Sequence, residues 1–378
     1  MERRERDVDV IVIGGGQAGL AVGYYLRRTD LSFAILDDRE EPGGAWRSRW
    51  ETLRLFSPAE HSSLPGWPMP RAQGERYRGD STGAPEYPSR EDTISYLRRY
   101  EERYDLPARR PVRVEAVRRE GEGYVLETSE GDDSEALWRA RAVVSATGTE
   151  AAPHVPSYPG QDAFRGEEMH SSAYRSPMPL MGERVVVVGA GNSGAQIMAE
   201  VSTVADATWA TLDEPTFLPP DVDGRVLFGE ATARYEAQQK GKEKEPAYSL
   251  HDIVQVPPVR EAREAGRLEA RRMFERFTPV GVVWPGGAEE PVDTVIWATG
   301  FDAALGPLAP LGVTGADGHA RMDGLRAASE PRLWLVGYGN WTGFASATLI
   351  GVGRTARRAA REIEEALSAE KMPAGNPA

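Results

Sequence analysis

Two glycine-rich turns with the same spacing constrain the fold of this chain more than any other feature. The first turn reads GGGQAG at residues 14–19, and the second reads GAGNSG at residues 189–194. A continuous apolar run precedes each turn, at 10–13 and at 185–188, and predicts a buried parallel strand. A helical pattern follows each turn. Strand, glycine turn and helix in this order are typical of a dinucleotide-binding unit.

Each residue type in the first unit has a physical task. Gly14 permits the tight turn, and Gly16 lets backbone N–H groups approach a pyrophosphate at the positive end of the helix. Gly19 lets the helix pack closely on the strand. Asp37 ends the next apolar run, 33–36, and we expect it to accept hydrogen bonds from a ribose diol.

The second unit repeats this plan. Its next strand, expected around 208–212, ends at Asp213 and Glu214. A single glycine pattern is a weak signal, because glycine-rich turns are common. Two copies, each with strand, helix, strand and terminal acid, predict two nucleotide sites and therefore electron transfer between two cofactors.

Two further strands indicate how the units are joined. Residues 142–145 lead into Thr147 and Gly148 before the second glycine turn, and 295–298 lead into Thr299 and Gly300 after it. We interpret these segments as the two crossings between domains.

The predicted fold class is therefore α/β, with two Rossmann-like dinucleotide-binding domains, one inserted into the other. The first domain is expected at 1–150, the inserted domain at 151–297, and the completion of the first at 298–378. That completion should contain a strand at 333–336 and a helix from about Ser346.

Composition excludes several classes of protein. The chain of 378 residues has no cysteine, which excludes disulfides, iron–sulfur clusters and thiol catalysis. Its net charge of −13 argues against nucleic-acid binding, which needs a basic surface. We find no signal-peptide pattern and no apolar run of about 20 residues, so we expect a cytoplasmic protein without membrane contact.

Three motifs narrow the class further. Phe164, Gly166, His170 and Tyr174 match the fingerprint F-x-G-x-x-x-H-x-x-x-[FYW], just before the second glycine turn. The segments GGAW at 43–46 and LPGWPMP at 64–70 look like the GGxW and LPxxPxP segments of the same family. The chain thus resembles the bacterial flavin-containing monooxygenases, which belong to the two-dinucleotide-binding flavoproteins.

This resemblance implies the cofactors and the reaction. FAD would occupy the first unit and NADH or NADPH the second, and O2 would add to the reduced flavin to form a C4a-hydroperoxide. The substrates implied are small molecules, namely sulfides, amines and possibly ketones by Baeyer–Villiger oxidation; the subunits are expected to form a homodimer. Baeyer–Villiger enzymes usually carry Trp at the last fingerprint position, so Tyr174 favours the branch that oxidises heteroatoms.

The site residues follow from the motifs. We expect Phe56, His170 and Tyr174 to serve the cofactor chemistry, with no side-chain nucleophile and no metal; His170 should lie near the nicotinamide and the interdomain linker. The residues expected to contact the cofactors are Gly14, Gly16, Gln17, Ala18, Gly19, Asp37, Gly43, Gly44, Trp46, Thr147, Gly148, Gly189, Gly191, Asn192, Ser193, Gly194, Asp213, Glu214, Thr299, Gly300, Gly337 and Asn340.

Two departures from the family pattern affect the function. Phe56 stands where many members place an Asn near the flavin, and a Phe side chain cannot donate a hydrogen bond. Some reduced flavin is therefore expected to yield hydrogen peroxide. Asp213 and Glu214 stand where NADPH enzymes usually place Arg, so NADH should be used at least as well as NADPH, unless Arg225 or Arg234 folds in to bind the 2′-phosphate.

Other functions compete with that of a monooxygenase. A disulfide reductase of the thioredoxin reductase type needs a Cys pair, which this chain lacks. An NAD(P)H oxidase or flavin reductase needs no further residues, and a flavin-binding sensor without activity also stays open. Residues 221–277 are the least readable part, although 254–258 are candidates for lining the substrate approach.

Overall fold

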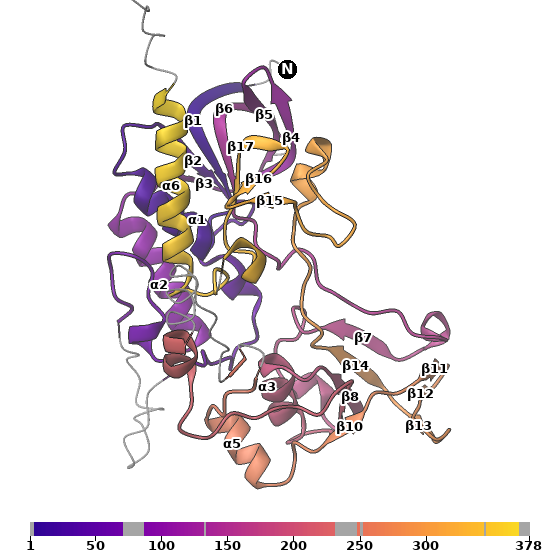
Figure 1. Cartoon of the computed structure of the whole chain (residues 1–378). Coiled ribbons are helices and arrows are strands. Elements are labelled where there is room, and N and C mark those ends of the chain that lie inside the picture. The colour runs from indigo at the N-terminus through magenta and orange to yellow at the C-terminus, as the bar shows by residue number, and fades with distance from the viewer. Residues whose placement is uncertain are drawn as a thin grey trace, which may run out of the picture.

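The computed structural model describes residues 4–70, 87–131, 134–230, 248–249, 252–343 and 345–369. Two sheets dominate it, one above the other in Figure 1. The large sheet has nine strands and is assembled from both ends of the sequence. The other sheet has five strands, all from the middle of the sequence.

The large sheet has a parallel centre. Its order is β15-β16-β17-β6-β1-β2-β3, and β1 pairs in parallel with both β2 and β6. Its strands are β1 (Arg4–Ile13), β2 (Phe33–Leu36), β3 (Ala108–Arg109), β4 (Val112–Glu120), β5 (Gly123–Glu130), β6 (Glu135–Ser145), β15 (Met322–Asp323), β16 (Arg326–Ala327) and β17 (Glu330–Leu335). Three helices accompany it: α1 (Gln17–Leu26), α2 (Arg90–Arg103) and α6 (Val352–Ser368).

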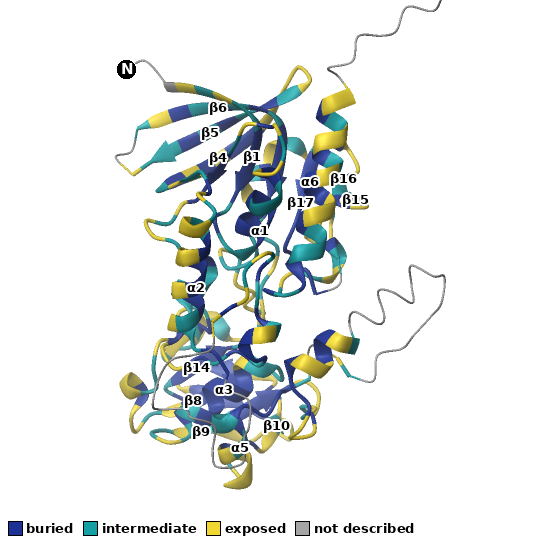
Figure 2. Ribbon diagram, turned by 90° about the vertical axis from the view of Figure 1, so that its left-hand side faces the viewer, coloured by how far each residue is buried: buried dark blue, intermediate teal, exposed yellow. Residues whose placement is uncertain are grey.

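Alternation along β1 separates the two faces of this sheet. Val10 and Val12 pack in the core that contains the apolar residues of α1 and α6. Ile11 and Ile13 pack in a second core, with the antiparallel strands β4 and β5. All four are buried, as expected for a strand covered on both faces, and this part of β1 is dark blue in Figure 2.

The middle of the sequence forms a second parallel sheet, in the order β10-β9-β8-β14-β7. Its strands are β7 (Glu167–His170), β8 (Arg184–Val188), β9 (Asp206–Thr211), β10 (Ala270–Arg272) and β14 (Thr294–Trp297). Its helices are α3 (Asn192–Val201) and α5 (Pro257–Glu264), and a small antiparallel sheet of β11 (Arg276–Thr278), β12 (Gly281–Val283) and β13 (Glu289–Pro291) adjoins it. Both predicted glycine turns therefore lead from a parallel strand into a helix.

The two chain crossings between the sheets run side by side. Pro153 and Phe301 form an antiparallel bridge, and the amide of His154 donates to the carbonyl oxygen of Gly300 at 3.0 Å. The amide of Asp302 donates back to the carbonyl oxygen of Ala152 at 2.8 Å. The inserted sheet is thus connected to the large sheet by a two-stranded ribbon.

The predicted start of the last helix is wrong by about six residues. The helix begins at Val352, and the hydroxyl of Ser346 instead donates to the carbonyl oxygen of Gly339 at 2.7 Å. Thr342 shares this network at 2.7 Å from Ser346. Such hydroxyl bonds to the local backbone compete with helix formation, which explains the delay. Within the described residues, no helix is both long and apolar enough to cross a bilayer.

Candidate active site

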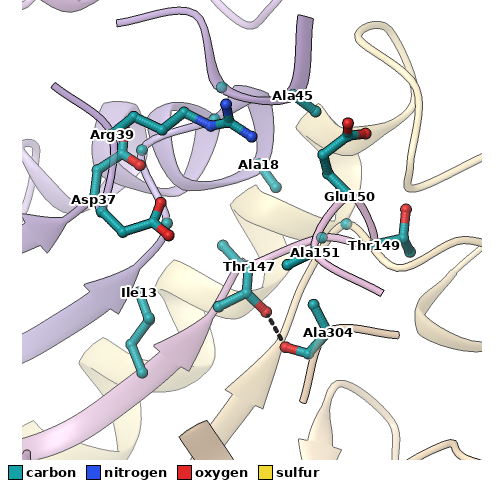
Figure 3. Close-up of a pocket in the computed structure, with 18 of the residues that line it drawn as sticks. Ile13, Ala18, Asp37, Arg39, Ala45, Thr147, Thr149, Glu150, Ala151 and Ala304 are labelled. Atoms are coloured by element: carbon teal, nitrogen blue, oxygen red, sulfur yellow. Dashed lines mark hydrogen bonds between the residues drawn. The ribbon is translucent and has the colours of Figure 1, made fainter. Parts of the chain in front are cut away.

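A cavity of about 770 Å³ opens at the carboxyl ends of β1, β2 and β6 (Figure 3). Asp37 lines one end of it and Glu150 the other, and the guanidinium of Arg39 points from the side of Asp37 toward Ala45 and donates to the hydroxyl of Ser48 at 3.1 Å. Ten of the residues expected to contact a cofactor line this cavity: Gly14, Gly16, Gln17, Ala18, Asp37, Gly44, Trp46, Thr147, Gly148 and Gly337. The cavity is therefore built by the first unit, the GGAW segment, the first crossing and the C-terminal part of the chain.

The first glycine turn has no room for a side chain at Gly14 or Gly19. Gly14 has φ +103°, and a Cβ there would lie 2.5 Å from the carbonyl oxygen of Ala146. A Cβ on Gly19 would lie 1.9 Å from the carbonyl oxygen of Gly14. On the other side of the turn, a Cβ on Gly44 would lie 2.7 Å from the Cα of Gly16. The turn thus forms a close-packed cradle whose backbone lines the cavity at a helix N-terminus, which suits a pyrophosphate.

The second glycine turn repeats this geometry contact for contact. Gly189 has φ +132°, and its Cβ would lie 2.3 Å from the carbonyl oxygen of Ala298. A Cβ on Gly194 would lie 2.1 Å from the carbonyl oxygen of Gly189. A Cβ on Gly191 would meet no atom within 4 Å, and one on Gly16, its counterpart in the first turn, would meet only the Cα of Gly44 at 3.8 Å. The second turn therefore presents an open helix N-terminus.

Gln17 links three parts of the cavity wall. Its side-chain oxygen accepts from the indole Nε1 of Trp46 at 3.0 Å, and its Nε2 donates to the carbonyl oxygen of Ala347 at 2.5 Å. These bonds hold the GGAW segment and the chain before α6 against the start of α1. Gln17 thus shapes the cavity.

Asp37 lies at the cavity but already has a partner that no sequence motif indicated. The Nε of Arg110 donates to its carboxylate at 2.8 Å, and the same guanidinium binds Glu101 at 2.6 and 2.8 Å. Neighbouring charges outweigh burial and raise the pKa of Arg110, with the bond to Glu101 the largest favourable contribution. Arg110 lies 73 positions from Asp37, so no local pattern pointed to it.

Thr147 fixes the floor of the cavity. Its hydroxyl donates to the carbonyl oxygen of Ala304 at 2.7 Å, as the dashed line in Figure 3 marks. The hydroxyl of Tyr338 lies 2.6 Å from that of Thr147 and 2.5 Å from that of Ser145. Complete burial raises the pKa of Tyr338, so it remains a neutral hydrogen-bonding group.

A buried ion pair, which the motifs also did not indicate, forms the wall at the first crossing. Arg49 and Glu150 are in direct contact, with side chains only 17 % and 11 % exposed. Burial lowers the pKa of Arg49 and raises the pKa of Glu150, each against the opposing effect of the partner. The guanidinium of Arg49 also lies 4.8 Å from the ring centroid of Phe301, so it contacts both crossings.

His170 lies at the second crossing and not in the cavity lining. Its Nε2 is 2.8 Å from the carbonyl oxygen of Gly300, and its Nδ1 accepts from the amide of Ser172 at 3.1 Å. Its ring packs edge-on against Phe301, with centroids 4.7 Å apart. Burial lowers the pKa of His170, which favours the neutral ring. His170 therefore contacts the ribbon between the two sheets at Gly300 and Phe301.

Tyr174 is packed inside the protein. It is 1 % exposed, its ring meets that of Trp50 edge-on, and its hydroxyl donates to Glu200 of α3 at 3.1 Å. Glu200 also contacts Thr52, and burial raises the pKa of this carboxyl group. The last fingerprint residue thus joins the large-sheet part of the protein to α3.

Several other expected cofactor contacts lie outside the cavity lining. Asn340 is exposed at the start of a short 3-10 helix, Asn340–Thr342. Gly43 is the N-cap residue of another 3-10 helix, Gly44–Ser48. Thr299 donates its hydroxyl to the carbonyl oxygen of His154, within the ribbon. Phe56 is half-buried and faces Phe228, with ring centroids 6.0 Å apart.

The second unit shows which side chains are available to a nucleotide. Ser193, Asp213 and Glu214 are exposed. Asn192 is engaged: its Nδ2 donates to the carbonyl oxygen of Asp252 at 3.1 Å, and its Oδ1 accepts from the amide of Val254 at 2.9 Å.

The segment that Asn192 binds, at Asp252 and Val254, leads into residues buried in the hydrophobic core. Val254 and Val256 are fully buried, and the Nε2 of Gln255 donates to the carbonyl oxygen of Leu218 at 2.6 Å. Val254 and Val256 pack in the hydrophobic core that also contains the apolar residues of α3, so the expectation that 254–258 line the substrate approach is wrong for these two residues.

Comparisons with known proteins agree with this geometry. The family model for pyridine nucleotide-disulphide oxidoreductases matches residues 11–216. A flavin-containing monooxygenase from Stenotrophomonas maltophilia is 47 % identical, covers 96 % of this chain and 99 % of its own, and superposes with a TM-score of 0.84. The chain belongs to the flavin-containing monooxygenases.

Sequence relatives place it in the same class. A CzcO-like oxidoreductase of Geobacillus kaustophilus is 30 % identical over 78 % of this chain and 80 % of its own. An indole-3-pyruvate monooxygenase of Oryza sativa subsp. japonica is 26 % identical over 96 % of this chain and 93 % of its own.

This flavin-containing monooxygenase has the α/β fold with two dinucleotide-binding domains that its glycine turns predicted. A bacillithiol disulfide reductase from Bacillus cereus, 19 % identical with a TM-score of 0.71, shares the fold alone. Although the family model is named for disulphide chemistry, this monooxygenase has no cysteine with which to perform it.

Proposed function

We propose that this monooxygenase binds FAD in the 770 Å³ cavity and NADH or NADPH at the second glycine turn. We further propose that it transfers one oxygen atom of O2 to soft nucleophiles, sulfides and amines first, with ketones as a further class. The observation that carries the proposal is the pair of glycine turns with matching close contacts, at Gly14 and Gly189. Each turn follows a parallel-paired strand, in two sheets that a short ribbon joins. We place the domain boundaries at residues 150 and 297.

The first unit fits FAD. A Cβ at Gly14, Gly19 or Gly44 would meet backbone atoms, so the turn is shaped for close approach of a ligand to its amides. Gly14 and Gly16 would hold the pyrophosphate, Asp37 the adenosine ribose, and the wall of Trp46 and Thr147 the remainder. When bound, the flavin supplies the redox chemistry with hydride donor and O2.

The residues of this chain would orient and enclose that group. Thr147, fixed by Ala304 and Tyr338, would present its backbone to the cofactor at the floor. Arg49 and Glu150 would close the wall at the crossing and exclude water there. His170 would set the distance between the two nucleotides by holding the ribbon at Gly300, and Tyr174 would do so by anchoring α3.

We propose NADH as a coenzyme used at least as well as NADPH. Two exposed carboxylates, Asp213 and Glu214, follow β9 where a 2′-phosphate would lie, and they would repel it. Arg225 is bound to Asp223 at 3.0 Å, and Arg234 lies outside the described residues. The first cation to consider for NADPH is Arg272, exposed on β10 and paired in register with Thr211.

A second candidate, an NAD(P)H oxidase that releases hydrogen peroxide, is favoured by Phe56. Its side chain offers no hydrogen-bond donor at a position that the family resemblance places beside the flavin. Its ring instead packs on Phe228.

One experiment separates the two candidates. Purified yellow protein is given NADH or NADPH, with and without an aryl methyl sulfide, while O2 uptake, peroxide and sulfoxide are followed together. Sulfoxide formed in step with coenzyme consumption supports the monooxygenase with this substrate class. Peroxide alone favours the oxidase, and a kcat/KM about tenfold higher for NADPH would contradict the coenzyme proposal.

We also propose a homodimer as the solution state. Light scattering of the FAD-loaded protein tests it, since a mass of one chain, 41.4 kDa, would contradict it.

A further inference from the structure

A segment between β9 and α5 reaches back to the large-sheet part of the protein. We call residues 221–230 the docking segment. Asp223 begins a short helix, residues 224–230, and its carboxylate accepts from the amide of Arg225 at 2.8 Å, as an N-cap does. The docking segment belongs by sequence to the inserted domain, yet two of its residues, Gly224 and Phe228, contact the loop that carries Phe56.

The backbone contact at this junction is close and specific. The amide of Gly224 donates to the carbonyl oxygen of Phe56 at 2.8 Å. A Cβ on Gly224 would lie 2.4 Å from the Cβ of Ser57 and 2.9 Å from the carbonyl oxygen of Phe56. Only glycine allows these two backbones to approach this closely.

Two side-chain contacts hold the docking segment in place. Asp223 is 2 % exposed, and its carboxylate accepts from the hydroxyl of Tyr87 at 3.2 Å and from the Nε of Arg225 at 3.0 Å. Phe228 is buried and its ring lies 6.0 Å from that of Phe56, at 39°. The carbonyl and the ring of Phe56 are therefore both held by the docking segment.

We infer that the docking segment is a positioning element for Phe56, and that Gly224 and Phe228 fix the placement of that ring beside the reacting centre. This inference rests on the proposed function, because the family resemblance places Phe56 beside the flavin, whereas Phe56 itself lies outside the residues that line the cavity. Gly224 and Phe228 touch Phe56 and not the cavity lining, so they act through it. The inserted domain thereby contributes to the oxygen-reacting side through residues far from its own glycine turn.

The test uses the FAD-loaded full chain and two glycines of the same helix. Gly224→Ala forces a side chain into Ser57, whereas Gly229→Ala adds one where no atom lies within 4 Å. Both replacements favour the helix to a similar degree, so they differ in the contact with Phe56. Phe228→Leu removes the ring contact with Phe56 and introduces no steric clash. This variant therefore tests the positioning of Phe56 if Gly224→Ala does not fold.

Three measurements are needed: amide hydrogen exchange, the rate of flavin reduction and the rate of flavin re-oxidation. Amide hydrogen exchange of peptides covering 53–62 reports the docking itself. Anaerobic reduction by NADH and re-oxidation of the reduced enzyme by O2, each followed by flavin absorbance, report the consequence at the site.

We expect Gly224→Ala and Phe228→Leu to raise exchange at 53–62 and to change the re-oxidation rate by about fivefold or more, with reduction within about twofold of the parent. Gly229→Ala should match the parent in exchange at 53–62, in the reduction rate and in the re-oxidation rate. Unchanged exchange would overturn the docking, and faster exchange with an unchanged re-oxidation rate would overturn the positioning role. If the parent makes no sulfoxide, the proposed function fails while this comparison still decides, because reduced flavin reacts with O2 in an oxidase as well.

Discussion

The imidazole Nε2 of His170 lies 2.8 Å from the carbonyl oxygen of Gly300 while its Nδ1 accepts from the amide of Ser172 at 3.1 Å. A carbonyl oxygen can only accept and an amide can only donate, so the ring must be neutral with its proton on Nε2. This residue therefore joins β7 to the second crossing in a single protonation state.

Replacing His170 by Gln should remove a pH dependence of stability. Burial lowers the pKa of His170 below its ordinary 6.5, so the unfolded chain binds the proton more readily than the folded one. The stabilisation is complete above pH 6.5 and is lost as the pH falls through the lowered folded value. Gln keeps a donor but does not titrate. Melting curves should show the largest advantage of the parent at pH 8 and a smaller one at pH 5; a constant difference would contradict this.

Two glycine substitutions should separate the two nucleotide sites. Gly14→Ala places a Cβ 2.5 Å from the carbonyl oxygen of Ala146 at a φ of +103°, so we expect loss of FAD. Gly191 has φ −99° and open space, so Gly191→Ala should fold and keep its FAD. Its KM for NADH should still rise about tenfold or more, since the methyl group meets the nucleotide. An unchanged KM would place the coenzyme elsewhere.

Breaking the buried pair of Arg49 and Glu150 should be costly. Glu150→Ala leaves a guanidinium that is 17 % exposed without its partner, which should lower the free energy of unfolding by about 3 kcal/mol. The double variant Arg49→Met with Glu150→Ala should cost less than the sum of the single changes. Arg184→Met, at a pair that is 45 % and 39 % exposed, is the matched control and should cost under about 1 kcal/mol. Urea unfolding of the apo and FAD-loaded forms measures the free energy of unfolding of the two single variants, the double variant and the control.

Glu200→Gln should stabilise the protein at neutral pH or leave it unchanged. Burial raises the pKa of Glu200 above its ordinary 4.5, so the folded state binds this proton more readily than the unfolded chain does. Stability from this group is therefore present below pH 4.5 and is lost as the pH rises through the folded value. The amide oxygen of Gln still accepts from Tyr174. The melting temperature of Glu200→Gln relative to the parent should be higher at pH 8 than at pH 5, and the reverse order would contradict this.

Removing the two acids after β9 should improve the use of NADPH. Asp213→Asn with Glu214→Gln removes the charges that repel a 2′-phosphate, and we expect the NADPH to NADH ratio of kcat/KM to rise by about tenfold. Asp206→Asn, at the opposite end of β9, is the control and should leave the ratio unchanged. If Asp213 and Glu214 do not matter, Arg272→Ala is the next comparison.

Much of the fold was predictable because it depends on local rules. The apolar runs at 10–13 and 185–188 indicated buried strands, and both are buried in the structure. The glycine spacing after each run indicated a tight turn into a helix, which both turns make. The start of α6 was misplaced because the hydroxyls of Thr342 and Ser346 bind backbone and each other instead of entering the helix.

The sequence by itself determined what repeats along the chain: two glycine turns, the strands beside them, and the family to which their motifs point. Period and spacing are local, so they can be read without coordinates. Only the tertiary structure decided which distant charges and rings meet. Arg110 at Asp37, Glu150 at Arg49 and Gly224 at Phe56 lie up to 168 positions apart along the sequence. Long side chains and backbone contacts of this kind depend on how whole segments pack, and no spacing rule encodes that.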